Sequence, residues 1–484
     1  RGGLPLLAFV AVVGALLTHA LGPDVLVEPW NPWVPVLPFL LYVLLAWSVA
    51  ERDWAALPWL VGIGSFVVQT HVGYAPVAIG LGAIACALGA YGAARARNRA
   101  AEHDADTSPE PPPRMSARRW VIVAVVVGVL VWLAPVVQQL TGSPGNLGEI
   151  VDSFRHPKES VVGWDVGFGV IGHELGFIGP WITGDDTGST GLVTTASTIP
   201  ALLLLTATAA LGWLAWRRGA RDAGRLAVLA VAGAGLGVVA VSRITGFLGP
   251  YLVRWSWVLA ALLWLSVAWS LWRTLARASA TTALVAVSLV GVIVLTASTG
   301  WAAATVHVPQ PQFSDVVGRL GSSTAPHLDP DRRYLLKIVD TENLGATAVG
   351  VFLDLDEHGK QVRVERGFGK AFGSWRTAPE SQVDGVVTVV AGGDIERGWT
   401  PPPGAKRVAH YDPLASRERS RAQRLERQVR ARLGAAAPPN ALPVLSAGGR
   451  RLLVAEGADR RSVDALQHLH ERGDAYSVYL SPPA

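Results

Sequence analysis

Nine long stretches without Asp, Glu, Lys or Arg fill most of the first 306 residues of this 484-residue chain. They run over residues 4–21, 34–50, 54–69, 74–94, 120–140, 197–216, 226–241, 255–272 and 281–301. Each holds 16 to 21 residues, close to the roughly 20 apolar residues that a helix needs to cross a ~30 Å hydrocarbon core. The pattern therefore predicts an α-helical polytopic membrane domain over residues 1–306, with about nine transmembrane helices.

Arginine clusters between these stretches predict the orientation of the chain. The clusters are Arg95, Arg97 and Arg99 with Arg114, Arg118 and Arg119; Arg217, Arg218, Arg221 and Arg225; and Arg273 with Arg277. Each cluster follows an even-numbered stretch, and Lys and Arg stay on the cytoplasmic side of a membrane. We therefore expect a multi-pass protein of the cell membrane with a cytoplasmic linker at 95–119. A long outer loop at 141–195 and everything after Trp301 should lie outside the cytoplasm.

Composition agrees with a membrane protein, because 50% of the residues are hydrophobic and only 16% are charged. The net charge of +5 does not indicate nucleic-acid binding, since the arginines form no stripe with aromatic residues. Cys86 is the only cysteine, which excludes a disulfide within the chain. The chain begins with Arg1 and its only methionine is Met115, so we expect a fragment that lacks an N-terminal part.

Residues 307–484 predict a small extracytoplasmic α/β domain. Strands are expected at 333–340, 346–355 and 361–365, with a hairpin turn at 356–359. Further expected elements are strands at 385–390, 406–410, 451–455 and 474–480 and helices at 413–433 and 462–471. The helix at 413–433 is strongly charged, and we expect its charged face to be exposed to solvent.

The outer loops carry the candidate chemistry. Asp24 and Glu28 lie four residues apart beside Trp30 and Trp33. A carboxylate here could act as general base on a sugar hydroxyl or hold a divalent cation, and the indoles could stack on a sugar ring. The alternative is a solvated acid pair with an aromatic belt at the membrane surface.

Two arginines flank another outer loop. Arg243 and Arg254 lie at the outer ends of the seventh and eighth stretches, where a guanidinium could bind the phosphate of a lipid-linked donor. Arg243 is the first candidate, because Arg254 directly precedes Trp255 and could be an interface anchor. Snorkelling to the membrane surface is the alternative for both.

Polar side chains at the outer helix ends suggest a polar cavity under the long loop. The candidates are Gln69, His71, Tyr74, Gln138, Gln139 and Asn146. The alternative is that these groups simply cap helices. Within the long loop, the Gly-rich segment 163–179 is too interrupted to span and is predicted to be re-entrant or interfacial.

No metal site is predicted. Asp354 and Asp356 resemble the metal-binding pair of soluble nucleotide-sugar transferases, but they precede the expected hairpin turn of the outer domain. The pairs His173–Glu174 and His468–His470 lack further ligands at metal spacing, and we expect them to be structural or exposed to solvent.

Three motifs carry a family resemblance. They are NPWVPVLPF at 31–39, QTHVGY at 69–74 and PVVQQLTGSPGNL at 135–147. The first 300 residues resemble actinobacterial multi-pass membrane proteins of the GT-C glycosyltransferase superfamily. The resemblance implies a polyprenyl-phosphate-sugar donor at the outer leaflet and a catalytic Asp or Glu in the first outer loop. No residue is matched to that catalytic position, so Asp24 and Glu28 are candidates by position alone.

The sequence therefore predicts a membrane glycosyltransferase that moves a sugar from a polyprenyl-phosphate donor to a cell-envelope acceptor. The mechanism that the resemblance implies is direct displacement at the anomeric carbon, with the lipid phosphate as leaving group. The alternative is a non-enzymatic envelope protein, namely a lipid carrier, flippase or assembly factor whose outer domain binds a partner. A small-solute transporter is disfavoured, because no inverted repeat is evident in the sequence.

Overall fold

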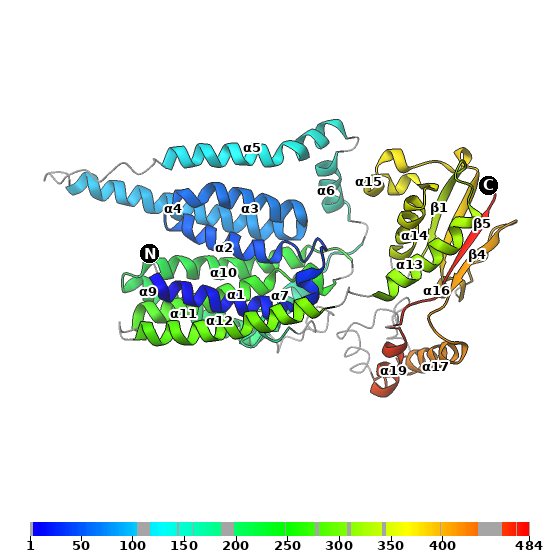
Figure 1. Cartoon of the computed structure of the whole chain (residues 1–484). Coiled ribbons are helices and arrows are strands. Elements are labelled where there is room, and N and C mark those ends of the chain that lie inside the picture. The colour runs from blue at the N-terminus through cyan, green and yellow to red at the C-terminus, as the bar shows by residue number, and fades with distance from the viewer. Residues whose placement is uncertain are drawn as a thin grey trace. The chain divides into compact units, whose positions relative to one another are not determined.

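The computed structural model describes residues 3–483, except for 104–116, 143–144, 158, 185–197, 247, 276–279, 307–310, 341–344, 397, 434–456 and 471. The chain divides into two compact units, Arg1–Val306 and His307–Ala484. Figure 1 labels the helices and strands of both units. The predicted strand at 451–455 and most of the linker at 95–119 lie outside the described residues.

The first unit is built from helices. They are α1 (Gly3–Val27), α2 (Val36–Ala50), α3 (Leu57–Thr70), α4 (Ala75–His103), α5 (Ala117–Thr141), α6 (Asn146–Arg155), α7 (Trp164–Glu174), α8 (Pro180–Thr183), α9 (Ile199–Arg217), α10 (Arg221–Ser242), α11 (Ser256–Leu275) and α12 (Ala280–Thr305). Within the described part of the chain, seven helices are long and apolar enough to cross a membrane: α1, α4, α5, α9, α10, α11 and α12. The predicted stretches 34–50 and 54–69 form α2 and α3, which have only 15 and 14 residues.

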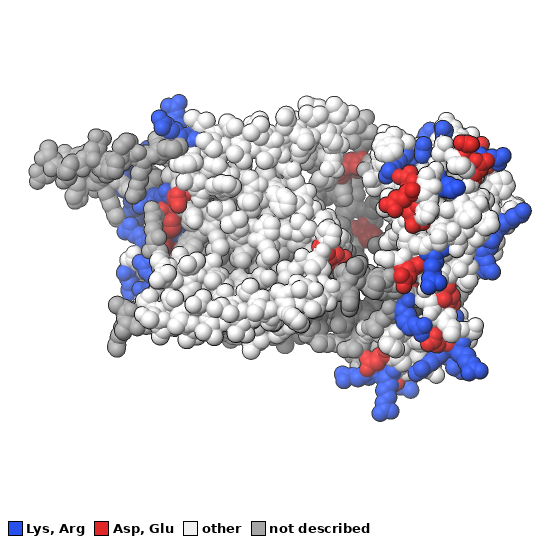
Figure 2. Space-filling view, in the orientation of Figure 1, with Lys and Arg blue, Asp and Glu red and all other residues white. Residues whose placement is uncertain are grey.

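The outer surfaces of these helices are apolar, as expected where lipid is the solvent. Only 6% of the most apolar part of α5 and of α12 is buried within the protein. Val125, Val129 and Leu130 of α5 are each more than half exposed. In Figure 2 the body of the helical unit is white, and blue and red side chains gather mainly at its ends. This distribution supports the prediction of a membrane protein.

The centre of the helical unit is formed by α10 and α11, whose apolar segments are 67% and 61% buried. Trp255, Trp257 and Trp269 are among its largest fully buried side chains. Small residues bring α9 and α10 close together, because a Cβ added at Gly212 would lie only 2.2 Å from the Cβ of Ala227.

The Gly-rich segment of the long loop contains the short helix α7, which packs on α10. A helix of 11 residues extends about 16 Å, which is too short to cross a bilayer. Its glycines permit close packing, since a Cβ at Gly167 would lie 3.1 Å from the Cβ of Ser242. The helix therefore brings its last residue, Glu174, into the interior of the unit.

Sidedness can be tested with single cysteines in a Cys86→Ala background. We expect Ser420→Cys, on the second unit, to react with a membrane-impermeant maleimide in intact cells. Arg97→Cys, at the exposed end of α4, should react only after permeabilisation, because its arginine cluster favours the cytoplasmic side. Gel-shift labelling measures both. The opposite labelling pattern would contradict the predicted orientation.

The second unit contains a mixed five-stranded sheet. Its strands are β1 (Arg333–Val339), β2 (Gln361–Val364), β3 (Gly385–Ala391), β4 (Lys406–Tyr411) and β5 (Tyr476–Ser481), in the order β2-β1-β3-β5-β4. β1 pairs in parallel with β2 and β3, whereas β5 is antiparallel to β3 and β4. β3 is buried along its whole length.

The α-helices described in the second unit are α13 (Pro311–Thr324), α14 (Ala346–Glu357), α15 (Gly369–Phe372), α16 (Gly392–Glu396), α17 (Ser416–Leu433) and α19 (Arg460–His470).

The strand predicted at 346–355 is wrong, because these residues form helix α14. Ala348, Val351, Phe352 and Leu355 are buried at the helical spacing of three or four residues, which gives α14 one apolar face in the sheet-packed core. The predicted hairpin turn at 356–359 is also wrong, because it is the end of this helix. Gly359 follows with a φ of +73°, as is common after a helix C-terminus.

The charged helix α17 is not solvated on all sides. It packs against α19 through a small apolar cluster that includes Ala422, Val429 and Val463. Arg419 of α17 makes a two-pronged contact with Asp412, at 3.0 and 2.6 Å. Burial alone would raise the pKa of Asp412, but the hydrogen bonds from Arg419 and the Leu414 N–H, together with the charges of Arg419 and His410, lower that pKa.

Candidate functional site at the loop ends of the helices

Three side chains from two distant loops meet where α2 and α11 begin. Trp33 donates a hydrogen bond from Nε1 to Glu28, 3.1 Å away. The guanidinium of Arg254 lies 5.0 Å from the centre of the same Trp33 ring. Glu28 and Arg254, two of the predicted site residues, are thus connected through one indole.

The array continues into the interior. Arg254 also stacks on Trp257 at 4.1 Å, and only 4% of Arg254 is exposed. Trp257 in turn donates from Nε1 to Glu174 at 2.7 Å, and Glu174 is likewise 4% exposed. Five side chains are therefore in consecutive contact, in the order carboxylate, indole, guanidinium, indole and carboxylate. We call these five residues, Glu28, Trp33, Arg254, Trp257 and Glu174, the tryptophan–arginine array.

The sequence analysis expected the His173–Glu174 pair to be structural or exposed to solvent, and it did not place Glu174 in the candidate site. The structure shows a buried carboxylate at the end of α7 with an indole N–H and the Ser256 hydroxyl as partners. The signal was present in the sequence: an acidic residue within an apolar Gly-rich segment is expensive in a membrane unless it is paired.

The connection between α3 and α4 is attached to the loop between α1 and α2. Tyr74 donates its hydroxyl to the backbone oxygen of Pro32 at 3.2 Å and is only 1% exposed. His71 accepts from the Gly73 N–H at 3.2 Å, which requires a neutral ring nitrogen. Burial lowers the pKa of His71, so the neutral ring is favoured at pH 7. Tyr74 therefore helps to position the loop that bears Trp33, and His71 stabilises the turn that carries Tyr74.

The remaining polar candidates have other contacts. The side-chain oxygen of Gln138 accepts from Asn146 N–H at 3.1 Å, and that of Gln139 accepts from Leu147 N–H at 2.7 Å. Both glutamines therefore cap the start of α6, the alternative role that their position suggested. Gln69 donates to the backbone oxygen of Val131 at 3.1 Å. None of the described hydrogen bonds joins these residues to the tryptophan–arginine array, and their common cavity stays a prediction.

The two arginine candidates differ sharply in surroundings. Arg254 lies between two indoles, whereas Arg243 directly follows α10, is exposed and has no polar side-chain contact among the described residues. Both belong to the loop between α10 and α11. The side chain of Asp24 lies outside the described residues.

Asp354 and Asp356, the two aspartates considered in the sequence analysis, lie beside basic side chains. Asp356 pairs with Arg376 at 2.8 Å, and Asp354 lies 3.4 Å from His358. Over the part of the chain that the structure describes, no group of three or more His, Cys, Asp or Glu side chains could hold a metal ion. The side chain of His470 lies outside that part.

Chemically, the array offers two carboxylates and one guanidinium, and the loop that carries Arg254 also carries the exposed Arg243. A carboxylate can take a proton from a hydroxyl, and an exposed guanidinium can bind a phosphate with a planar pair of N–H donors. The two halves of such a site come from the first loop and from the loop after α10. No protein-family model, no curated protein and no solved structure matches the chain significantly.

Proposed function

We propose that the protein is a membrane glycosyltransferase that moves a sugar from a polyprenyl-phosphate donor to a cell-envelope acceptor at this site. The main support is the tryptophan–arginine array, which attaches the acidic first loop to the arginine-bearing loop after α10. The array thereby joins the loop that carries Glu28 to the loop that carries Arg243, and in this proposal both residues serve the same transfer.

Each residue has a proposed role. The acceptor hydroxyl gives its proton to the carboxylate of Glu28 while its oxygen forms a bond to the anomeric carbon. The bond from that carbon to the phosphate oxygen breaks, and the polyprenyl phosphate leaves with the electron pair. Arg243 stabilises the leaving phosphate, because its exposed guanidinium has no competing partner among the described residues. Arg254 is a positioning residue that holds Trp33 beside Trp257.

The test is transfer from a radiolabelled polyprenyl-phosphate sugar to cell-envelope acceptor by the purified protein in proteoliposomes. Arg243→Ala should lower the rate roughly ten- to a hundredfold, because a charge-assisted contact is worth about 1.5–3 kcal/mol. Arg243→Lys should recover part of it, since a point charge lacks the planar fork.

Arg155→Ala is the matched control, because Arg155 is also an exposed arginine at a helix end in the outer loops. Transfer that is unchanged in Arg243→Ala would remove the phosphate role. A wild-type protein that binds the donor but never transfers sugar would favour a non-enzymatic lipid carrier, flippase or assembly factor.

A further inference from the structure

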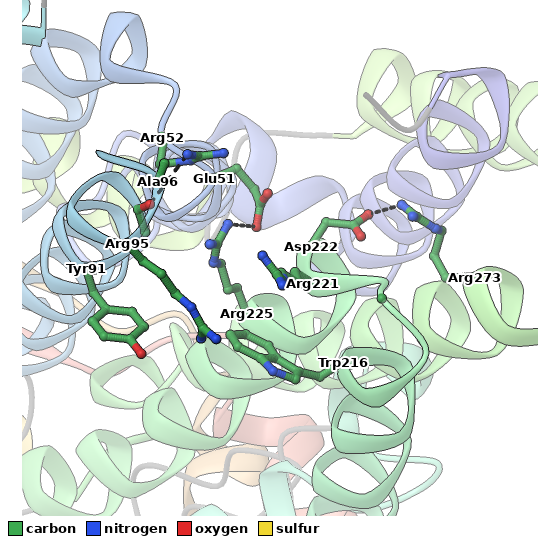
Figure 3. A pocket seen from close by; sticks show the side chains of 12 residues that line it. Glu51, Arg52, Tyr91, Arg95, Ala96, Trp216, Arg221, Asp222, Arg225 and Arg273 are labelled. Carbon is green, nitrogen blue, oxygen red and sulfur yellow. Dashed lines mark hydrogen bonds and ion pairs between the residues drawn. The ribbon is translucent and has the colours of Figure 1, made fainter. Parts of the chain in front are cut away.

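A second polar region lies at the opposite ends of the same helices. It is a pocket of about 560 Å³ between the α2–α3 turn, the late part of α4, the α9–α10 connection and the end of α11 (Figure 3). Its charged lining consists of Arg52, Arg95, Arg221, Arg225 and Arg273 with Glu51 and Asp222. Five arginines and two carboxylates give a formal charge of 5 − 2 = +3. We call this the arginine pocket.

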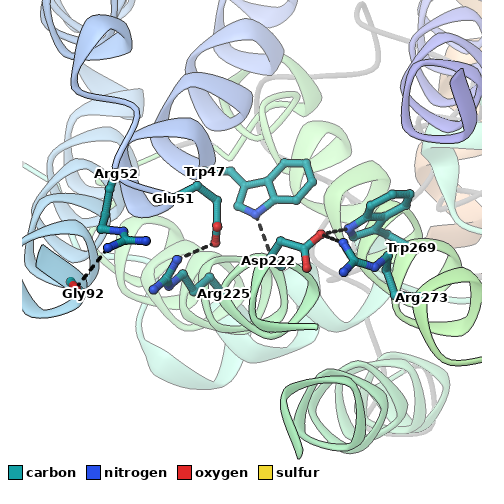
Figure 4. A network of polar contacts seen from close by, with 8 residues as sticks. All are labelled: Trp47, Glu51, Arg52, Gly92, Asp222, Arg225, Trp269 and Arg273. Atoms are coloured by element: carbon teal, nitrogen blue, oxygen red, sulfur yellow. Dashed lines mark hydrogen bonds and ion pairs between the residues drawn. The ribbon is translucent and has the colours of Figure 1, made fainter. Parts of the chain in front are cut away.

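The carboxylates of the arginine pocket are already engaged. Glu51 pairs with Arg225 at 2.8 Å, and Asp222 pairs with Arg273 (Figure 4). Asp222 also accepts from the indole N–H of Trp269 at 3.0 Å. These contacts neutralise two arginines and fix the ends of α2, α10 and α11 relative to one another.

Three arginines of the pocket have no carboxylate partner among the described residues, and one of them, Arg52, donates to the backbone oxygen of Gly92 at 3.4 Å. Arg95 and Arg221 are exposed, line the pocket and have no polar side-chain partner among the described residues. Arg221 is also the first residue of α10, whose N-cap Ala220 supplies no capping side chain. The dipole of the helix therefore adds to the positive potential at this point. An anion with several oxygens, such as a phosphate, is the complementary ligand.

An apolar groove adjoins the arginine pocket. It has a volume of about 580 Å³ and runs between α9 and α10. Its lining is Ala209, Gly212, Trp213, Trp216, Gly224, Ala227, Val228, Val231 and Ala232. Trp216 lines both spaces, so groove and pocket meet at this indole. Trp213 and Val228 are 59% and 44% exposed, which leaves the groove open to a hydrocarbon chain.

We propose that one anionic phospholipid occupies both spaces, with its phosphate between Arg95 and Arg221 and an acyl chain in the α9–α10 groove. A soluble phosphate would use only the charged part, whereas a lipid uses the charged pocket and the apolar groove together. The occupant thus follows from the charge of one space and the apolar lining of the next. This site is separate from the proposed transfer site, so either proposal can fail alone.

Native mass spectrometry of the full chain in detergent, titrated with dioleoylphosphatidylglycerol, measures the binding. The Arg95→Ala/Arg221→Ala double variant should weaken the first bound lipid roughly tenfold or more, since each arginine near an anionic lipid is worth about 1 kcal/mol. Folding should be unaffected, because neither side chain has a polar contact within the described part of the chain. Arg97→Ala/Arg119→Ala removes two exposed arginines that do not line the pocket, and it is the matched control. Equal weakening in both double variants would overturn the site.

The groove is tested separately. Ala209→Phe places a ring in the groove and should weaken lipid binding several-fold, whereas Ala210→Phe, an exposed neighbour outside the lining, should not. Glycerol 3-phosphate should compete only weakly, because it lacks the chain. Competition as strong as that of the lipid, together with normal binding in Ala209→Phe, would show a soluble-phosphate site and overturn the lipid proposal. Equal binding of dioleoylphosphatidylcholine would overturn the role of the two arginines.

Discussion

Glu28→Gln should reduce sugar transfer by roughly a hundred- to ten-thousandfold, the usual contribution of a general base. Glutamine can still accept the hydrogen bond from Trp33 Nε1, so the loop should keep its position. It cannot take a proton from the acceptor hydroxyl at neutral pH. The loss should therefore appear in the rate at saturating donor, with little change in donor binding. Transfer from the radiolabelled polyprenyl-phosphate sugar measures the rate, and equilibrium binding of the same sugar measures the affinity for the donor.

Two variants distinguish this role from a structural one. Glu28→Asp keeps the carboxylate and should recover part of the activity. Asp152→Asn changes an exposed acid of α6 that contacts only His156 of its own helix among the described residues, and it should behave as wild type. Full activity in Glu28→Gln would place the catalytic carboxylate elsewhere, with Asp24 the next candidate by position.

The second large effect concerns stability. Arg225→Ala should lower the free energy of unfolding of the helical unit by about 3–5 kcal/mol, because it leaves a largely buried carboxylate without its ion-pair partner. Only 9% of the Arg225 side chain and 16% of the Glu51 side chain are exposed, so water can solvate little of the remaining charge. The midpoint of unfolding on addition of sodium dodecyl sulfate, followed by circular dichroism, measures the change.

A rescue and a control give this prediction its specificity. Replacing both partners, as Glu51→Met/Arg225→Met, should restore most of the stability, since an apolar pair leaves no buried charge. Arg273→Ala breaks a pair in which 34% of the arginine side chain is exposed, and it should lower stability by about 1 kcal/mol or less. If the double variant is as unstable as Arg225→Ala, the loss comes from packing and not from charge.

The membrane helices were predictable because a charged side chain has a large free-energy cost in lipid, so a long segment without charges indicates a transmembrane helix. Their lengths were less predictable. α2 and α3 lie close together in sequence, and the turn at Glu51–Asp53 between them, in which Arg52 adopts a φ of +66°, leaves each with 15 residues or fewer. The strand predicted at 346–355 is helix α14 because its β-branched residues fit a helix once one apolar face is covered by the sheet.

The candidate site was predictable in part. Position near outer helix ends pointed to Glu28 and Arg254, but no sequence pattern shows that one indole connects them. Glu174 is separated from Arg254 by 80 positions in the chain, and only the packing of α7 on α10 brings it near Trp257. Gln138 and Gln139 were ambiguous for a local reason, because a glutamine at a helix end can serve a cavity or cap the next helix.

The packing of α1 along α12 bears on how the protein is made. His19 of α1 lies 3.1 Å from the hydroxyl of Thr299, and these residues are 280 positions apart in the chain. At a synthesis rate of 5–20 residues per second, roughly 15–55 s pass between their emergence from the ribosome. During that interval lipid or another membrane protein must cover the surface of α1 that α12 later takes. The helical unit therefore closes only when its final helix has been inserted.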